Sequence, residues 1–108
     1  MSADALPAPV QAALAAANAH DVEAFLAVFT PDGVVDDWGR EFRGREPIRG
    51  WSDAEFIGVD VTLDVTAAAE RGGETVVTAD VGGRGFNGES HFAFRVEGDR
   101  VARMTIRA

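Results

Sequence analysis

The stretch VDVTLDVT, from Val59 to Thr66, alternates an apolar side chain with a polar one at every step. A period of two residues is typical of a strand that buries one face and exposes the other. We therefore predict a strand here, with Val59, Val61, Leu63 and Val65 facing a core. A shift of register by one residue would bury the polar side chains instead, at a large cost in free energy.

Further strands are predicted on both sides of this stretch, separated by turn-forming residues. Towards the C-terminus they are Thr75–Val81, Ser90–Val96 and Val101–Arg107. The connections Arg71–Glu74, Gly82–Gly88 and Glu97–Asp99 all contain glycine, which adopts positive φ at little cost. Towards the N-terminus, Val34–Trp38 is predicted to pair with Glu41–Arg43 across a turn at Gly39 and Arg40.

Three helices are predicted in the first half of the chain. Apolar residues at helical spacing follow Pro9, and the first helix ends at Asn18. Asp21 caps a second helix that runs to Phe29, and the residues Thr30–Gly33 read as the turn that stops it. The third helix covers Glu46–Phe56. Helices followed by a meandering antiparallel sheet predict an α+β fold.

Length and composition limit the possible functions. The 108 residues suit a single domain, with residues 1–6 expected to form a flexible tail. The net charge of −8 predicts repulsion from nucleic acid and from anionic membranes, and no apolar run approaches the roughly 20 residues that span a bilayer. The N-terminus lacks the features of a secretory signal, and the chain has no cysteine. We expect a cytoplasmic protein.

No cofactor or metal ion is expected. The letters Gly83–Gly88 match a dinucleotide-binding glycine pattern, but a strand rather than a helix follows them, so a hairpin loop is the better interpretation. The two histidines, His20 and His91, lie far apart and have no ligand spacing between them. All ten basic residues are arginine, which excludes a Schiff-base lysine, and there is no tyrosine.

The pair Asp36 and Asp37 offers the best candidate for chemistry. Alternation along the strand places one of the two on the side of the buried residues. A carboxylate on an apolar interior has its charged form disfavoured, which suits a general acid or base. The alternative is a structural ion pair with Arg40 or Arg43. Glu55 shares a helix face with Trp51 and offers a second, less favoured inward carboxylate.

Four segments in this order resemble the NTF2-like superfamily, in its SnoaL-like and ketosteroid-isomerase-like branch. The segments are Ala16–Asp21, Phe29–Asp37, Arg43–Ile48 and His91–Val96. The resemblance extends from about Val10 to Arg107. It implies a cone in which three helices pack on a curved antiparallel sheet around an internal cavity. It also implies a homodimer formed through the sheet.

The resemblance also implies site positions. The isomerase's carboxylate base falls on Asp37, which selects Asp37 over Asp36 as the inward residue. Its tyrosine falls at about Ala13 and its second oxyanion donor at Ser90, so ketosteroid isomerisation itself is not predicted. A polyketide-cyclase mechanism would use a cavity histidine or aspartate, and by strand parity His91 faces outward. The ligand-binding residues are expected to be Trp38, Phe42, Trp51, Glu55, Ser90, Phe92 and Met104.

Three functions remain open from the sequence. The first is an isomerase or cyclase in which Asp37 moves a proton on an apolar or aromatic small molecule. The second is a non-catalytic module that binds such a metabolite, and the third is a dimerisation domain with a filled cavity. We expect Asp37 to be an uncompensated carboxylate whose replacement by asparagine raises stability, and we expect Asp36→Asn to have a much smaller effect.

Overall fold

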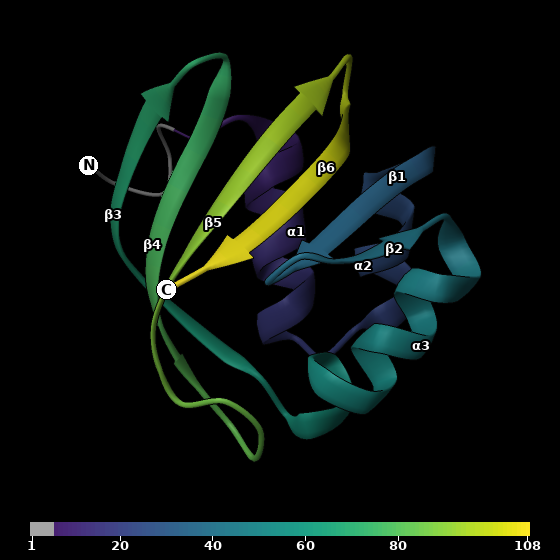
Figure 1. The fold of residues 1–108 in the computed structure, drawn as a ribbon, viewed down its shortest axis with the longest axis vertical. Coiled ribbons are helices and arrows are strands. Elements are labelled where there is room, and N and C mark those ends of the chain that lie inside the picture. The colour runs from purple at the N-terminus through teal and green to yellow at the C-terminus, as the bar shows by residue number, and fades with distance from the viewer. Residues whose placement is uncertain (1–5) are drawn as a thin grey trace.

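Residues 6–108 are described by a computed structural model, in which three α-helices cover one face of a curved sheet (Figure 1). The sheet has six strands in the order β2-β1-β6-β5-β4-β3. Neighbouring strands are antiparallel except β1 and β6, which run parallel. The elements are α1 (Ala8–Asn18), α2 (Val22–Val28), β1 (Phe29–Asp37), β2 (Arg40–Arg43), α3 (Arg45–Glu55), the 3-10 helix η2 (Ile57–Val59), β3 (Thr62–Arg71), β4 (Glu74–Gly82), β5 (Gly88–Glu97) and β6 (Arg100–Arg107).

The predicted flexible tail, residues 1–6, extends at least one residue too far, because Leu6 belongs to the folded domain. Residues 1–5 lie outside the described part of the chain. Leu6 is buried within the hydrophobic core, and its carbonyl accepts a hydrogen bond from Gln11 Nε2 at 2.7 Å. Burial of this apolar side chain fixes the chain just before α1.

The alternating stretch forms a strand, but the strand begins three residues later than predicted. Val61 and Leu63 are buried and Val65 is half-buried, as expected for the inner face. The prediction for Val59 is wrong, because this residue ends η2 and Asp60 then adopts a left-handed conformation with φ of 58°. Gly58 makes this tight turn possible, since a Cβ there would lie 1.7 Å from the carbonyl oxygen of Asp53.

Side chains at and just after the end of α1 hold the start of β3 against the helices. Asn18 donates to the Leu63 carbonyl at 3.0 Å and accepts from the Leu63 amide at 2.7 Å. The His20 ring nitrogen Nε2 lies 2.7 Å from the Val61 carbonyl. These contacts join segments more than 40 residues apart, and they give His20 a structural role.

The predicted turn at Thr30–Gly33 is wrong, because these residues belong to β1. An irregularity in the pairing with β6 absorbs them between Phe29 and Val34. Asp37 pairs with Arg40, so the hairpin turn consists of Trp38 and Gly39, one residue earlier than expected. Both turn residues have positive φ, which is the geometry of a type I′ turn and matches the twist of the flanking strands.

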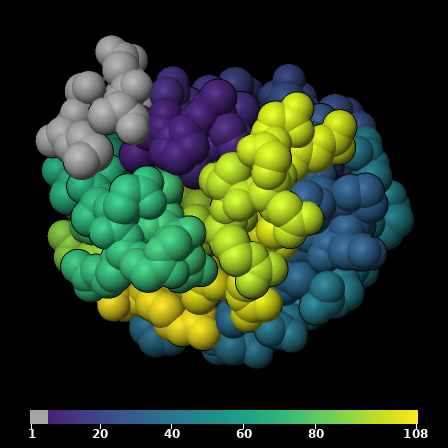
Figure 2. Space-filling view, turned by 90° about the horizontal axis from the view of Figure 1, so that it is seen from above, coloured from purple at the N-terminus to yellow at the C-terminus, as the bar shows by residue number. Residues whose placement is uncertain are grey.

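The two ends of the molecule differ. Figure 2 looks onto the end formed by the start of α1, in purple, and the β3–β4 and β5–β6 turns, in green and yellow-green. The opposite end carries the β4–β5 loop and the last turn of α3 (Figure 1). Within residues 6–108, no helix is long and apolar enough to cross a membrane.

Candidate functional site

A surface-open pocket of about 360 Å³ lies at the end of the molecule that carries the β4–β5 loop. Its wall combines the C-terminal half of α3, the β1–β2 turn, η2 and the inner face of the sheet. Most of the lining is apolar, with a polar group at Asp37, Arg40, Glu55 and Ser90. The apolar and glycine lining is Trp38, Trp51, Ala54, Phe56, Val59, Val61, Val81, Gly82, Gly85, Phe86, Phe92 and Ile106.

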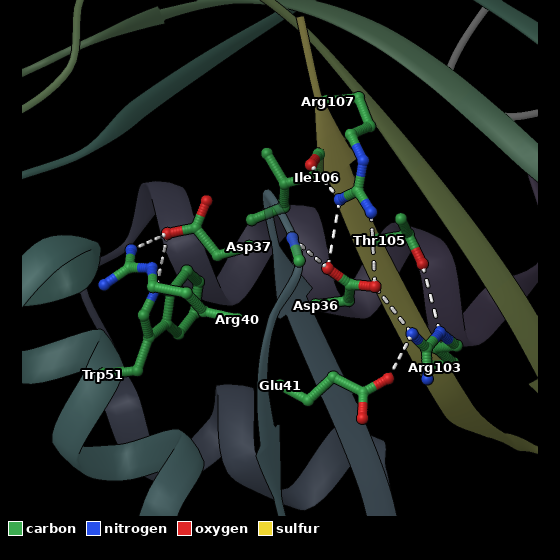
Figure 3. Close-up of polar contacts among 10 residues, drawn as sticks. Asp36, Asp37, Arg40, Glu41, Trp51, Arg103, Thr105, Ile106 and Arg107 are labelled. Atoms are coloured by element: carbon green, nitrogen blue, oxygen red, sulfur yellow. Dashed lines mark hydrogen bonds and ion pairs between the residues drawn. The ribbon is translucent and has the colours of Figure 1, made fainter.

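Asp37 lies at the last position of β1, and alternation from the buried Val35 turns its side chain to the inner face. Its Oδ2 accepts hydrogen bonds from Trp51 Nε1 at 3.0 Å and from Arg40 Nη2 at 2.5 Å. Its Oδ1 has no hydrogen-bond partner among residues 6–108 (Figure 3). One oxygen of this carboxylate is therefore fixed and the other is available to a ligand.

Arg40 joins the two acidic residues of the pocket. Its guanidinium donates to Glu55 Oε1 at 2.7 Å and Oε2 at 2.9 Å in addition to Asp37. The hydrogen bond from Arg40 lowers the pKa of Glu55, against the opposing effect of burial. The expectation that Asp37 is uncompensated is wrong, because a guanidinium three residues away reaches it across the two-residue turn.

Ser90 and the aromatic residues form the inner wall. Ser90 is 3% exposed and lines the pocket, and its hydroxyl makes no hydrogen bond to the described residues. Trp51 stacks on Phe56 with ring centroids 4.8 Å apart, and Phe92 lies 6.5 Å beyond Phe56. The wall therefore presents a continuous aromatic surface with one free hydroxyl beside it.

Two residues expected in the pocket do not line it. Phe42 lies on β2, and its ring packs near that of Trp51, with the two ring centroids 6.2 Å apart. Met104 is 1% exposed and belongs to the core on β6. Alternation identifies an inward face but does not say which inward residues border the open end of the cone.

Asp36 points to the opposite side of the sheet and is the more deeply buried aspartate (Figure 3). Its carboxylate accepts from Arg103 Nη2 at 2.7 Å, from Arg107 Nη1 at 3.0 Å and from the Gly39 amide at 2.7 Å. The hydrogen bond from Arg107 lowers the pKa of Asp36, burial opposes it, and the Gly39 amide and Arg103 lower it further. These contacts favour a structural role for Asp36, so the structure leads us to expect a larger loss of stability for Asp36→Asn than for Asp37→Asn.

Arg40 and Phe86 line the pocket but are not among the ligand-binding residues expected from the sequence, where Phe86 is only one of seven aromatic residues that could wall a pocket. The sequence offers Arg40 only as a structural partner of the aspartates, because its contact with Glu55, 15 residues away, has no local signal. Phe86 lies in a glycine-rich loop, and only the structure shows that its side chain is exposed at the pocket. The part of the chain that the structure describes contains no group of three histidine or acidic residues able to hold a metal ion.

Known structures share this fold along nearly the whole chain. A protein from Sinorhizobium meliloti assigned as a polyketide cyclase is 27% identical, with a TM-score of 0.89, and 99% of this chain covers 100% of that one. A protein with a ketosteroid isomerase-like fold from Catenulispora acidiphila, solved in complex with trimethylamine, is 26% identical with a TM-score of 0.79, and the match covers 94% of this chain and 85% of that one.

A designed binder of 17-OHP, 17% identical with a TM-score of 0.78, shares the fold over 93% of this chain and 88% of its own. No curated protein matches the sequence at a significant level. The sequence matches the SnoaL-like domain family over residues 10–104. This chain therefore belongs to the SnoaL-like domain family of the NTF2-like fold.

Proposed function

We propose that this chain binds a small apolar or aromatic molecule in the pocket and that Asp37 moves a proton on it, as in an isomerisation or a cyclisation. The observation that carries the proposal is the asymmetry of the Asp37 carboxylate. Trp51 and Arg40 hold Oδ2, whereas Oδ1 is free of protein donors among the described residues and the side chain lines the pocket. A fixed carboxylate with one available oxygen is suited to accept a proton from a bound molecule.

The step can be written for a carbon acid. Asp37 Oδ1 takes a proton from a carbon next to a carbonyl group, the C–H electron pair forms the C=C bond of an enolate, and the carbonyl oxygen takes the negative charge. The carboxylic acid then returns the proton to carbon. The Ser90 hydroxyl lines the pocket and makes no hydrogen bond to the described residues, so it can serve as a donor to the developing oxyanion.

The size and lining of the pocket support a small substrate. A volume of about 360 Å³ lies near the lower end of the range for ligand sites, and most of the lining is apolar. One similar structure agrees with a small ligand, since it was solved with trimethylamine. A compact molecule with one carbonyl group fits these limits better than a long or highly charged one.

Deuterium exchange tests the proposal directly. 2-Tetralone, a compact aromatic ketone, is incubated with the protein in D2O and the loss of its α-protons is followed by proton NMR. We expect exchange above the buffer rate, and Asp37→Asn should reduce the protein-dependent rate by about 100-fold or more, the usual contribution of a general base. Asp64→Asn, at an exposed residue on the outer face of β3, is the matched control. No exchange above buffer, or full activity in Asp37→Asn, would contradict the proposal.

A non-catalytic binding module is the second candidate. The observations that favour it are the ion pair between Arg40 and Asp37 and the alanine at position 13, where the isomerase branch has a tyrosine. Native mass spectrometry of the purified protein distinguishes the two functions. A retained small molecule together with an absence of exchange would favour binding without chemistry.

We also propose a cytoplasmic homodimer that pairs through the outer face of the sheet. That face combines small and half-buried residues of β5 and β6, such as Ala93 and Thr105, with the Asp36 network. Sedimentation should give about twice the chain mass of 11.4 kDa. A species at the chain mass would contradict the dimer.

A further inference from the structure

We propose that the pocket selects planar ring systems, which are held between Trp38 and Phe86 at its mouth. The ring would carry a hydrogen-bond donor or a polarised C–H group on the side facing Asp37. This inference rests on the proposed binding function and adds a substrate class to it: flat aromatic or conjugated bicyclic molecules rather than saturated ones.

Trp38 and Phe86 are the two large hydrophobic side chains that are exposed among residues 6–108. Their exposed fractions are 59% and 57%, and both line the same pocket. They come from separate elements, the β1–β2 turn and the β4–β5 loop. A single exposed apolar residue is ordinary, but two large ones that line the same pocket form a candidate binding surface.

Trp38 occupies a backbone position that does not suit it. Its φ is +55° in the first position of a two-residue turn, where asparagine, aspartate or glycine is preferred. A bulky aromatic residue in this region is strained. A hydrogen bond from the Gly39 amide to Asp36 Oδ1 at 2.7 Å stabilises the turn from the outer face of the sheet. The hydrogen bond fixes the backbone of the turn that carries Trp38, at a position where a smaller residue would be preferred.

Phe86 is held in place by the loop that carries it. Arg84 ties the loop to the end of η2, donating from its amide to the Val59 carbonyl at 2.8 Å and from Nε to Asp60 Oδ2 at 2.7 Å. The Phe86 ring lies over Gly88, because a Cβ built there would be 3.2 Å from Phe86 Cζ. These contacts fix the conformation of the β4–β5 loop and with it the position of the Phe86 ring at the mouth of the pocket.

The chemistry of the mouth and the wall favours a flat ligand. Aromatic side chains bind other rings by offset stacking or edge-to-face contact with centroids 4.5–7 Å apart. The stacked pair Trp51 and Phe56 continues the aromatic surface into the pocket. Asp37 directly precedes Trp38 and lines the same pocket, so a ring held at Trp38 can turn its polar edge to the free Oδ1.

Two probes with one carbon skeleton test the proposal by isothermal titration calorimetry. 2-Naphthol is planar and 2-decalol is its saturated counterpart, and both carry one hydroxyl group. We expect 2-naphthol to bind about 10-fold more tightly than 2-decalol. We expect Trp38→Leu and Phe86→Leu each to reduce the affinity for 2-naphthol by about 3- to 10-fold, because aromatic contacts contribute about that much. Binding of 2-decalol should change by less than about 2-fold, because leucine retains apolar surface.

Further variants separate failure of the ring selection from failure of the pocket. Ala54→Trp fills the pocket from α3 and should abolish binding of both probes. If Ala54→Trp abolishes binding but the leucine variants leave the preference for 2-naphthol intact, the ring selection is overturned and the pocket remains. If neither probe binds the unmodified protein, or if Ala54→Trp changes nothing, the proposed binding function is overturned together with the ring selection. Circular dichroism melts confirm that each variant is folded.

Discussion

Asp36 and Asp37 are adjacent in β1, yet their carboxylates lie in two very different surroundings. Asp36 is 6% exposed on the outer face, where two arginines from β6 and a backbone amide occupy both of its oxygens. Asp37 lies on the inner face, where one oxygen is held and the other is free among the described residues. Figure 3 shows the two side chains pointing away from each other.

This difference separates a structural carboxylate from a candidate functional one. A fully satisfied buried charge has no capacity left for a ligand, and removing it leaves its partners unpaired. A partly satisfied carboxylate at a pocket contributes less to stability, because its arginine partner has a side chain that is 53% exposed and is screened by solvent. Satisfaction of both oxygens, rather than burial alone, therefore distinguishes the two roles.

The largest effect is expected from Asp36→Ala. The change removes the acceptor of Arg103 and Arg107 and should lower the free energy of unfolding by about 2–3 kcal/mol, somewhat below the range for fully buried ion pairs because both guanidiniums are partly exposed. Urea denaturation at neutral pH measures it. Asp64→Ala, at an exposed position of β3, is the matched control and should change stability by less than about 0.5 kcal/mol. A loss of that small size for Asp36→Ala would show that the outer network does not stabilise the fold.

The next effect is a loss of the Asp36 contribution in acid. The pKa of Asp36 is lowered in the folded protein, so its contribution is present above its ordinary value of 3.8 and is lost as the pH falls through the folded-state pKa. Asp36→Asn should be less stable than the unmodified protein by about 1–2 kcal/mol at pH 7, and this difference should shrink below about pH 4. Urea melts of the two proteins across this range, taken as differences, remove the contributions of the other carboxylates. A difference that stays constant or grows in acid would rule out a charged Asp36 as the source of stability.

The smallest effect on stability is expected from Asp37→Asn. Asparagine keeps an acceptor for Trp51 Nε1 and loses only the ion pair with a largely solvated arginine, so the free energy of unfolding should change by about 0.5 kcal/mol or less. The same variant is expected to lose the exchange activity proposed above. Thermal melts and the exchange assay on one preparation measure both. A stability loss as large as that of Asp36→Ala would assign Asp37 to the structure rather than to the pocket.

Much of the fold could be predicted because its signals are local. These signals come from residues that are close together in the sequence. They are the helical spacing before Asn18, the cap at Asp21 and the period of two after Val61. The errors fall where backbone geometry outweighs the pattern. The start of β3 was displaced by the left-handed Asp60, and the expected turn at Thr30–Gly33 was absorbed into β1 by its irregular pairing with β6.

The candidate site divides in the same way. Strand alternation and the family resemblance, both present in the sequence, placed Asp37 and Asp36 on opposite faces of β1 and named Trp51, Glu55, Ser90 and Phe92, all of which line the pocket. The tertiary structure alone decided which groups meet these carboxylates. Arg103 and Arg107 reach Asp36 from 67 and 71 residues away, and Glu55 meets Arg40 only because α3 packs against the hairpin. The physical reason is that a periodic pattern fixes the direction of a side chain, whereas its partners depend on which distant strands and helices the packed core brings beside it.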